Sequence, residues 1–248
     1  MKKIKWDLTV FYILTFILTI LFAVGQQQLK ISYDKITLPQ LAPLIAVICT
    51  FLLFATSRTT LNFNIRSIVI PKLLIAFVLP FIVFGIGFYV CKMLGLNTFL
   101  TENLIQSLPL SLIGMLIGAV GEEIGWRGFL QPNLERKYSV LVSSIITGLM
   151  WGLWHIGHYK NGVLFMIGFL LFTVSASVII RRILGRTNNN LTIPVLFHFS
   201  INIGFVIFYK NSLTDPRMIL TNGILWTVLA LAISIATNYD TKNKQHTT

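Results

Sequence analysis

The feature that most constrains the fold of this chain is a set of eight windows, each at least 19 residues long, that contain no Asp, Glu, Lys or Arg. The windows are 8–29, 36–57, 73–91, 103–121, 138–159, 161–180, 187–209 and 218–239. A helix needs roughly 20 apolar residues to cross the hydrocarbon core of a bilayer. Membrane strands would alternate polar and apolar residues, and these windows do not. We therefore predict an all-α polytopic membrane protein, with about eight transmembrane helices in one bundle and one domain over residues 1–248.

The distribution of charge supports this class and argues against nucleic-acid binding. Only 11% of the residues are charged, whereas a soluble domain has about 25%. With the N-terminus in the cytoplasm, 14 of the 20 Lys and Arg residues fall on the cytoplasmic side, as the positive-inside rule requires for an even number of spans. We expect a multi-pass protein of the cell membrane with both termini cytoplasmic. The first window could be a signal peptide, but its length and the seven windows that follow favour an uncleaved span.

Glycine pairs at four-residue spacing occur in the fourth and fifth windows and just after the fourth. The pairs are Gly114 and Gly118, Gly121 and Gly125, and Gly148 and Gly152. Small residues at this spacing let helix backbones approach closely. We expect spans four and five to pack tightly at these positions, which flank the polar residues described next.

The sequence GEEIGWRGF places two carboxylates and a guanidinium at the end of the fourth window. Glu123 and Arg127 are i and i+4 on a helix, in the order that favours an ion pair. Glu122 is rotated by about 100° and does not share the arginine equally. One carboxylate would be neutralised while the other stays available, in a helix that ends at about Gln131, before Pro132. The alternative is a solvated acidic pair at the end of a span.

Two later windows carry further polar side chains. His155 lies four residues after Trp151, and His158 follows near the outer end of the same window. His198 and Asn202 are i and i+4 on one face of the seventh span. The alternatives are a packing histidine at 155, an interfacial residue at 158 and an interhelical hydrogen-bonded pair at 198 and 202.

Together these side chains could activate water. An ionisable group inside a membrane is costly and usually marks function. No Ser or Cys at a matching position indicates a nucleophilic triad. Glu122, aided by His155, could act as a general base, and His198 with Asn202 could donate hydrogen bonds to an oxyanion, which is the chemistry of amide hydrolysis. One difficulty is geometric: a helix that begins near Ser139 carries His155 about 24 Å along its axis, past the bilayer centre near which Glu122 lies.

The three motifs resemble those of the CAAX protease and bacteriocin-processing family of intramembrane glutamate proteases, which includes the Ras-converting CAAX endopeptidase. The family's Glu-Glu-x-x-x-Arg is present as EEIGWR, its Phe-x-x-x-His as WGLWH with Trp in place of Phe, and its His-x-x-x-Asn/Asp as HFSIN. The motifs occur in the family's order over about a third of the chain. The resemblance implies a protease core at about 104–210.

Carried over by motif, the resemblance implies that Glu122 and His155 activate the water and that His198 and Asn202 form the oxyanion hole. The residues that would support the site are Glu123, Arg127 and Trp151. We expect no bound metal. A zinc site from Glu122, His155 and His198 is conceivable by ligand type, but the chain has no HExxH spacing.

The expected function is therefore an intramembrane endopeptidase acting on a membrane-associated peptide or protein, with no nucleic-acid partner. The family suggests peptide pheromone maturation or bacteriocin processing and self-immunity as roles. The first alternative is a non-catalytic membrane scaffold or immunity protein that acts by partner binding. The second is a small transporter with a Glu/His proton relay, which the lack of an internal repeat disfavours. The substrate, its prenylation and the oligomeric state stay open.

Overall fold

The computed structural model describes residues 6–33, 35–54, 61–64, 70–96, 98, 100, 104–185, 190–209 and 215–245, without the side chains of 104–110 and 237–245. Most of this described chain is helical, and its one β contact is an isolated parallel bridge between Asn62 and Asn190. The prediction of an all-α fold is confirmed.

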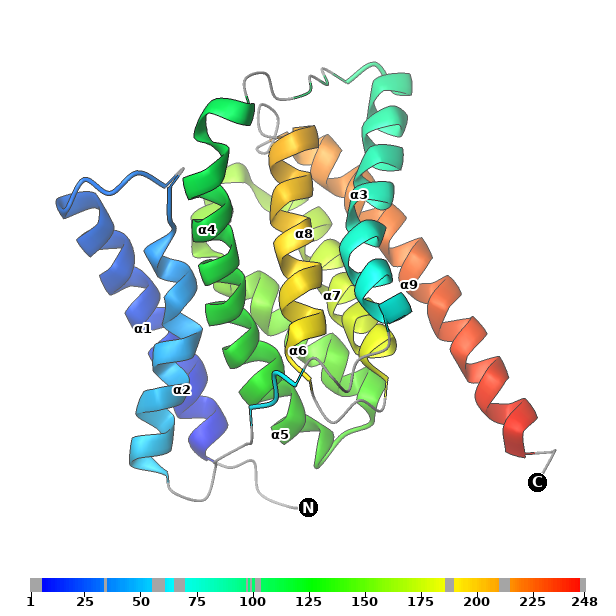
Figure 1. Ribbon diagram of the computed structural model, residues 1–248, viewed down its shortest axis with the longest axis horizontal. Coiled ribbons are helices and arrows are strands. Elements are labelled where there is room, and N and C mark those ends of the chain that lie inside the picture. Colours follow the sequence, from blue (N-terminus) through cyan, green and yellow to red (C-terminus); the bar gives the residue numbers. More distant parts are fainter. Residues whose placement is uncertain are drawn as a thin grey trace.

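Each charge-free window coincides with most of one main helix of the described chain (Figure 1). These helices are α1 (Trp6–Gln28), α2 (Ala42–Leu53), α3 (Ile70–Met93), α4 (Leu104–Glu123), α6 (Val140–Trp154), α7 (Val163–Leu184), α8 (Thr192–Tyr209) and α9 (Pro216–Gln245). Four short segments join them: η1 (Leu38–Leu41), η4 (Ile124–Leu130), α5 (Gln131–Glu135) and η5 (Ile156–Asn161). The sequence pattern therefore located the long helices.

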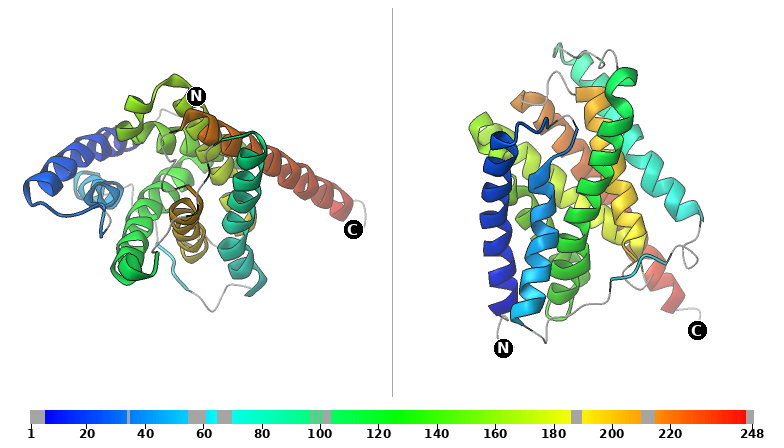
Figure 2. Two further views of the ribbon diagram at one scale, coloured as in Figure 1. Left: turned by 90° about the horizontal axis from the view of Figure 1, so that it is seen from above. Right: turned by 60° about the vertical axis from the view of Figure 1, so that its left-hand side comes forward.

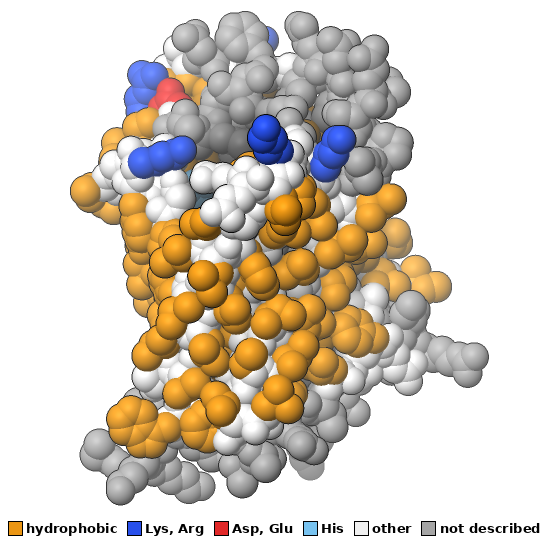
Figure 3. Space-filling model, turned by 90° about the vertical axis from the view of Figure 1, so that its left-hand side faces the viewer, with side chains coloured by type: hydrophobic (Ala, Val, Ile, Leu, Met, Phe, Trp, Pro, Cys, Tyr) orange, Lys and Arg blue, Asp and Glu red, His pale blue; other side chains and the backbone are white. Residues whose placement is uncertain are grey.

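Five of the helices in the described chain are long and apolar enough to cross a membrane, namely α1, α3, α7, α8 and the Pro216–Ala236 part of α9. The segments Leu38–Leu53 and Val140–Trp154 are apolar but shorter. Apolar side chains also cover the face seen in Figure 3, with Lys and Arg gathered toward its upper end. Soluble proteins rarely expose so large an apolar surface. The chain is a multi-pass membrane protein whose outer surface suits lipid.

The bundle is built around α7, which packs against α6, α8 and α9. Its apolar stretch is 67% buried, whereas that of α1 is 17% buried. The helices α1 and α2 lie together at one edge in both views of Figure 2. Two hydrogen bonds tie this edge to α6: the Tyr12 hydroxyl donates to the Met150 carbonyl, and the Trp154 indole donates to Thr19 Oγ1. In Figure 1, α1 begins and α9 ends at the same end of the bundle.

The glycine face of α4, which continues into η4, packs directly against the chain that leads into α2. A side chain at any of four glycines would overlap residues 35–43: at Gly114 the Lys35 carbonyl, at Gly118 the Gln40 side chain, at Gly121 the Gln40 carbonyl and at Gly125 the ring of Pro43. Because these glycines lack a Cβ, η1 and the start of α2 lie directly on the backbone of α4.

The glycines of α6 serve a different neighbour. A Cβ at Gly148 would meet the backbone of Thr173 and Val174, and one at Gly152 would meet the Thr173 hydroxyl, all in α7. The expectation of close helix packing is confirmed. The sequence did not name the partners, and the structure shows that they are residues 35–43 and α7. Four-residue spacing shows that a close approach is possible and does not show which helix makes it.

Candidate active site

The double glutamate lies where α4 passes into a π-helical segment. α4 ends at Glu123, and η4 closes with a hydrogen bond from the Gln131 N–H to the carbonyl of Trp126, five residues back. α5 then begins at Gln131 with Pro132 in its first turn. The predicted stop before Pro132 is therefore wrong, because proline is tolerated in a first turn, where its missing N–H costs nothing. π-helical turns occur frequently at functional sites.

Two side chains, Arg127 and His198, contact the carboxylate of Glu123. Arg127 Nη1 lies 2.8 Å from Glu123 Oε1, so the predicted i, i+4 ion pair is confirmed. His198 Nδ1 lies 2.8 Å from the same oxygen and donates to it. All three side chains are buried. The Arg127 guanidinium also stands 4.5 Å from the ring centroid of Trp151. Glu123 therefore neutralises a cation inside the protein, and Arg127, which we counted among the cytoplasmic charges, does not reach the surface.

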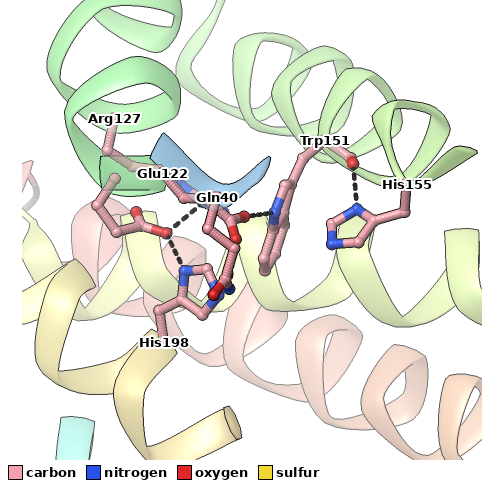
Figure 4. Close-up of polar contacts among 7 residues, drawn as sticks. Gln40, Glu122, Arg127, Trp151, His155 and His198 are labelled. Atoms are coloured by element: carbon pink, nitrogen blue, oxygen red, sulfur yellow. Dashed lines mark hydrogen bonds and ion pairs between the residues drawn. The ribbon is translucent and has the colours of Figure 1, made fainter. Parts of the chain in front are cut away.

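Glu122 is fully buried and has a different set of partners (Figure 4). Gln40 Nε2 donates to its Oε1 at 2.8 Å, and the Trp151 indole N–H donates to its Oε2 at 2.7 Å. His198 Nε2 faces Oε1 at 3.9 Å, beyond hydrogen-bond length. The arginine that neutralises Glu123 makes no ion pair with Glu122 among the contacts of the described residues. The two adjacent carboxylates are thus held separately, as the sequence predicted.

Trp151 separates the two histidines that the sequence singled out. In Figure 4, His155 lies on the far side of the indole from Glu122 and His198. The ring centroid of Trp151 is 5.1 Å from that of His198 and 6.1 Å from that of His155. The geometric difficulty noted above is borne out, because Trp151, one turn before the end of α6, donates to Glu122, and His155 lies beyond it.

His155 caps α6 and does not continue it. Its backbone leaves the helix (φ −74°, ψ 62°), and its Nδ1 donates to the carbonyl of Trp151 at 2.8 Å. The hydrogen bond fixes the tautomer, because a carbonyl can only accept, so Nε2 is the nitrogen left to act on a substrate or water. The ring stacks on His158 at 5.6 Å with an interplanar angle of 3°.

Asn202 lies one turn beyond His198 on α8 and is half-buried. We expect its amide to donate to a bound group, because an amide nitrogen carries two N–H donors. Several buried atoms around the ion pair lack a partner within the described chain, among them Glu123 Oε2 and the Nε and Nη2 atoms of Arg127. Buried polar atoms without partners are uncommon in proteins, and they are frequent where a substrate or water completes the set.

Sequence reasoning missed two of the contacts that hold Glu122. Gln40 is an ordinary glutamine in a short connection 82 residues earlier, and no local pattern distinguishes it. Trp151 was expected only to support the site, whereas its N–H is a donor to the carboxylate. The substitution of Trp for the family's Phe was the available signal, because an indole carries a donor that a phenyl ring lacks.

The described residues offer no evident set of ligands for a bound metal ion. Within the described residues, no group of three or more His, Cys, Asp and Glu side chains is arranged to hold a metal ion. Zinc sites require three or four such ligands at about 2.0–2.3 Å. The imidazole of His155 is turned to a backbone carbonyl, and one nitrogen of His198 is used by Glu123. The expectation of a metal-free site stays a prediction.

The site combines a candidate general base, Glu122, with candidate hydrogen-bond donors beside it. The carboxylate of Glu122 has both oxygens oriented by N–H groups, and the imidazole of His198 lies beside one of them. A water molecule can hydrogen-bond to Oε1 and to Nε2 at once, since two atoms 3.9 Å apart can both lie about 2.8 Å from a third. Such a site can take a proton from water and stabilise negative charge nearby.

Comparison with known proteins agrees with this chemistry. Residues 104–204 match the family model described as type II CAAX prenyl endopeptidase Rce1-like. Relatives include lysostaphin resistance protein A from Staphylococcus aureus strains bovine RF122 / ET3-1, Newman and USA300, each 29% identical over 240 residues. These alignments cover 94% of this chain and 55% of each relative, so the chain spans about half the length of the curated relatives it matches. At the level of the family, the match supports a membrane protease.

Proposed function

Residues 104–204 belong to the Rce1-like CAAX protease family, and from this premise we propose that the chain is an intramembrane glutamic endopeptidase. It hydrolyses a peptide bond of a membrane-associated peptide or protein with water activated by Glu122. The observation that supports this most directly is the buried carboxylate of Glu122, oriented by Gln40 and Trp151 with His198 Nε2 at 3.9 Å. A buried, oriented carboxylate that is not paired with the neighbouring arginine is a suitable general base.

The proposed reaction proceeds in two steps. Glu122 takes a proton from water while the water oxygen bonds to the carbonyl carbon of the substrate. The carbonyl oxygen becomes negatively charged and accepts hydrogen bonds from the Asn202 amide and from His198 when its Nε2 carries a proton. The carbon–nitrogen bond then breaks, and Glu122 returns its proton to the leaving amine. Glu123 and Arg127 fix His198 and do not exchange protons.

The role of His155 in this reaction comes from the family resemblance. The family resemblance implies that it activates the water together with Glu122, and its Nε2 is the free nitrogen for that role. The Trp151 indole stands between the two residues. We propose that His155 Nε2 acts on the reacting water through a second water molecule, while the Trp151 N–H stays on Glu122 Oε2. Because the tautomer of His155 is already set by the Trp151 carbonyl, this role requires no proton transfer on His155.

The proposed membrane orientation rests on where the termini lie and on the charge count along the sequence. We propose that both termini are cytoplasmic, since α1 begins and α9 ends at one end of the bundle and 14 of the 20 Lys and Arg residues fall on the cytoplasmic side when the spans are counted along the sequence. The names of the matched proteins bear on the substrate class in two ways. The matched family is named for a CAAX prenyl endopeptidase, and the relatives are named for lysostaphin resistance. We propose a membrane-bound peptide substrate whose cleavage contributes to resistance or self-immunity.

The decisive experiment uses purified protein in liposomes with two internally quenched peptides. One ends in an S-farnesylated cysteine followed by two aliphatic residues and a terminal residue, and the other is the same peptide without the farnesyl group. Glu122→Gln should lower cleavage by roughly 10²–10⁴-fold, the contribution of a general base. Glu135→Gln is the matched control, because this carboxylate pairs with Arg181 at the end of the same continuous helix and lies outside the site.

Three outcomes separate the proposals. Loss of cleavage in Glu122→Gln with full activity in Glu135→Gln supports the protease, and the preferred peptide shows whether the prenyl group matters. Wild-type protein that cleaves neither peptide contradicts the proposal. If Glu122→Gln also retains wild-type lysostaphin resistance in a host strain, the non-catalytic scaffold becomes the better explanation.

A further inference from the structure

Among the described residues, Gln40 is the one hydrogen-bond partner of Glu122 that lies outside the segment matched by the family. It lies in η1, before α2, whereas the family match covers 104–204. Its Nε2 donates to Glu122 Oε1 at 2.8 Å. On the basis of the proposed function, we propose that Gln40 is a positioning residue, which fixes the rotamer of the Glu122 carboxylate so that Oε1 faces His198.

The position of the Gln40 amide is determined by the glycine face of α4. The three atoms nearest to a Cβ built at Gly118 are the side-chain oxygen, carbon and nitrogen of Gln40. The Gln40 amide therefore occupies the space that any other residue at 118 would fill. A further glycine, Gly121, admits the Gln40 backbone carbonyl to the same face. Glycine at 118 thus lets the amide lie one helical turn before Glu122, within reach of its carboxylate.

The loop before η1 is also fixed. Gln26 at the end of α1 is buried and donates to the carbonyls of Ile31 and Ile36, while its Oε1 accepts from the Leu38 N–H. These three hydrogen bonds, two donated and one accepted by the Gln26 side chain, fix the backbone at Ile31, Ile36 and Leu38 just before and at the start of η1. The backbone of Gln40 is therefore fixed by the loop, and its amide packs in the space beside Gly118. Forming the hydrogen bond to Glu122 then costs little further side-chain entropy.

The two donors to Glu122 act on different oxygens. With the Trp151 N–H on Oε2 and the Gln40 N–H on Oε1, rotation about the last bond of the glutamate is blocked. The remaining position around Oε1 faces His198. A base that is held in one orientation reacts faster than one that rotates, because the productive geometry is already present before the reaction. Removing Gln40 should therefore lower kcat and leave KM nearly unchanged, because the amide contacts the base and makes no contact with the proposed substrate.

The test is a double-mutant cycle in liposomes with the farnesylated and unmodified peptides. Gln40→Ala should lower kcat roughly ten- to a hundredfold, the effect of losing one hydrogen bond to a charged group, with KM within about twofold. Gly118→Ala should cause a similar loss, because its methyl group displaces the Gln40 amide. In the Gln40→Ala background, Gly118→Ala should have almost no further effect, since the atoms it displaces are gone. Gln28→Ala, an exposed glutamine of α1, is the matched control.

The cycle distinguishes positioning from a structural role. A residue that only stabilises the fold would lower thermal stability and active fraction, with additive effects of Gln40→Ala and Gly118→Ala. If Gln40→Ala does not fold, Gly118→Ala and Gln40→Met supply the same comparison of kcat with KM. Wild-type kcat in a folded Gln40 variant, alongside an inactive Glu122→Gln, overturns the inference and leaves the proposed protease intact. A wild-type protein without cleavage overturns both.

Discussion

The substitution Trp151→Phe tests how this chain orients its carboxylate, because Phe is the residue that the resembled family carries at this position. The change keeps an aromatic ring against Arg127 and His198 but removes the indole N–H. That N–H lies 2.7 Å from Glu122 Oε2 and is the only side-chain donor to this oxygen among the described residues. The substitution therefore removes one hydrogen bond and preserves most of the packing.

The magnitude follows from the charge of the acceptor. A hydrogen bond to a charged group contributes roughly 1.5–3 kcal/mol, and about 1.4 kcal/mol corresponds to a tenfold change in rate. We expect kcat/KM for peptide cleavage to fall about ten- to a hundredfold. The lower end applies if water enters the space left by the five-membered part of the indole and donates in place of the N–H. The effect should fall mainly on kcat.

Trp126→Phe is the matched control for this experiment. Trp126 is also fully buried, but its indole N–H has no acceptor within the described chain. Its substitution removes the same atoms from an indole whose N–H donates no hydrogen bond to Glu122, so folded protein should keep nearly wild-type kcat. Cleavage kinetics in liposomes and thermal unfolding in detergent give both readouts. Wild-type kcat in Trp151→Phe, or an equal loss in Trp126→Phe, would refute the reasoning.

Two further predictions concern the ion pairs and can be checked by unfolding in detergent. Arg127→Met should lower the free energy of unfolding by roughly 3 kcal/mol, because it leaves the Glu123 carboxylate buried with only His198, and the partly exposed Arg181→Met should cost clearly less. Asp215 caps α9, and hydrogen bonds from Arg217 hold its pKa below the ordinary value of 3.8. A lowered pKa stabilises the fold above pH 3.8 and loses this effect as the pH falls further, so Asp215→Ala should cost less than about 1 kcal/mol at neutral pH and nothing in strong acid.

The helices could be predicted because the bilayer imposes a strong and local requirement. Every backbone N–H and C=O in hydrocarbon must be satisfied within the segment, so a charge-free window of sufficient length becomes a helix. The pair of Glu123 and Arg127 was predictable for a similar reason, since both partners lie on one helix four residues apart. These inferences depend only on neighbouring positions in the chain.

Contacts between distant segments were not predictable in this way. Nothing in the sequence around Gln40 indicates a partner 82 residues later. The separation of Glu122 from His155 by Trp151 depends on how far α6 rises before it ends, which spacing alone does not give. The π-helical segment was also missed, because residue preferences barely distinguish a π-helix from an α-helix. The resemblance proposes the residues of the site, and the structure shows which of them meet.

The position of Gln40 has a consequence for how the family match should be understood. The matched segment 104–204 supplies Glu122, Trp151 and His198, yet one of the two donors that orient Glu122 comes from the connection between α1 and α2. That connection reaches the site only because α4 presents glycines to it. Two relatives could therefore share every motif residue and still differ in the orientation of the base, if their residues corresponding to Gly118 and Gln40 differ. We therefore predict that activity in such chains depends on a contact that no motif within 104–204 describes.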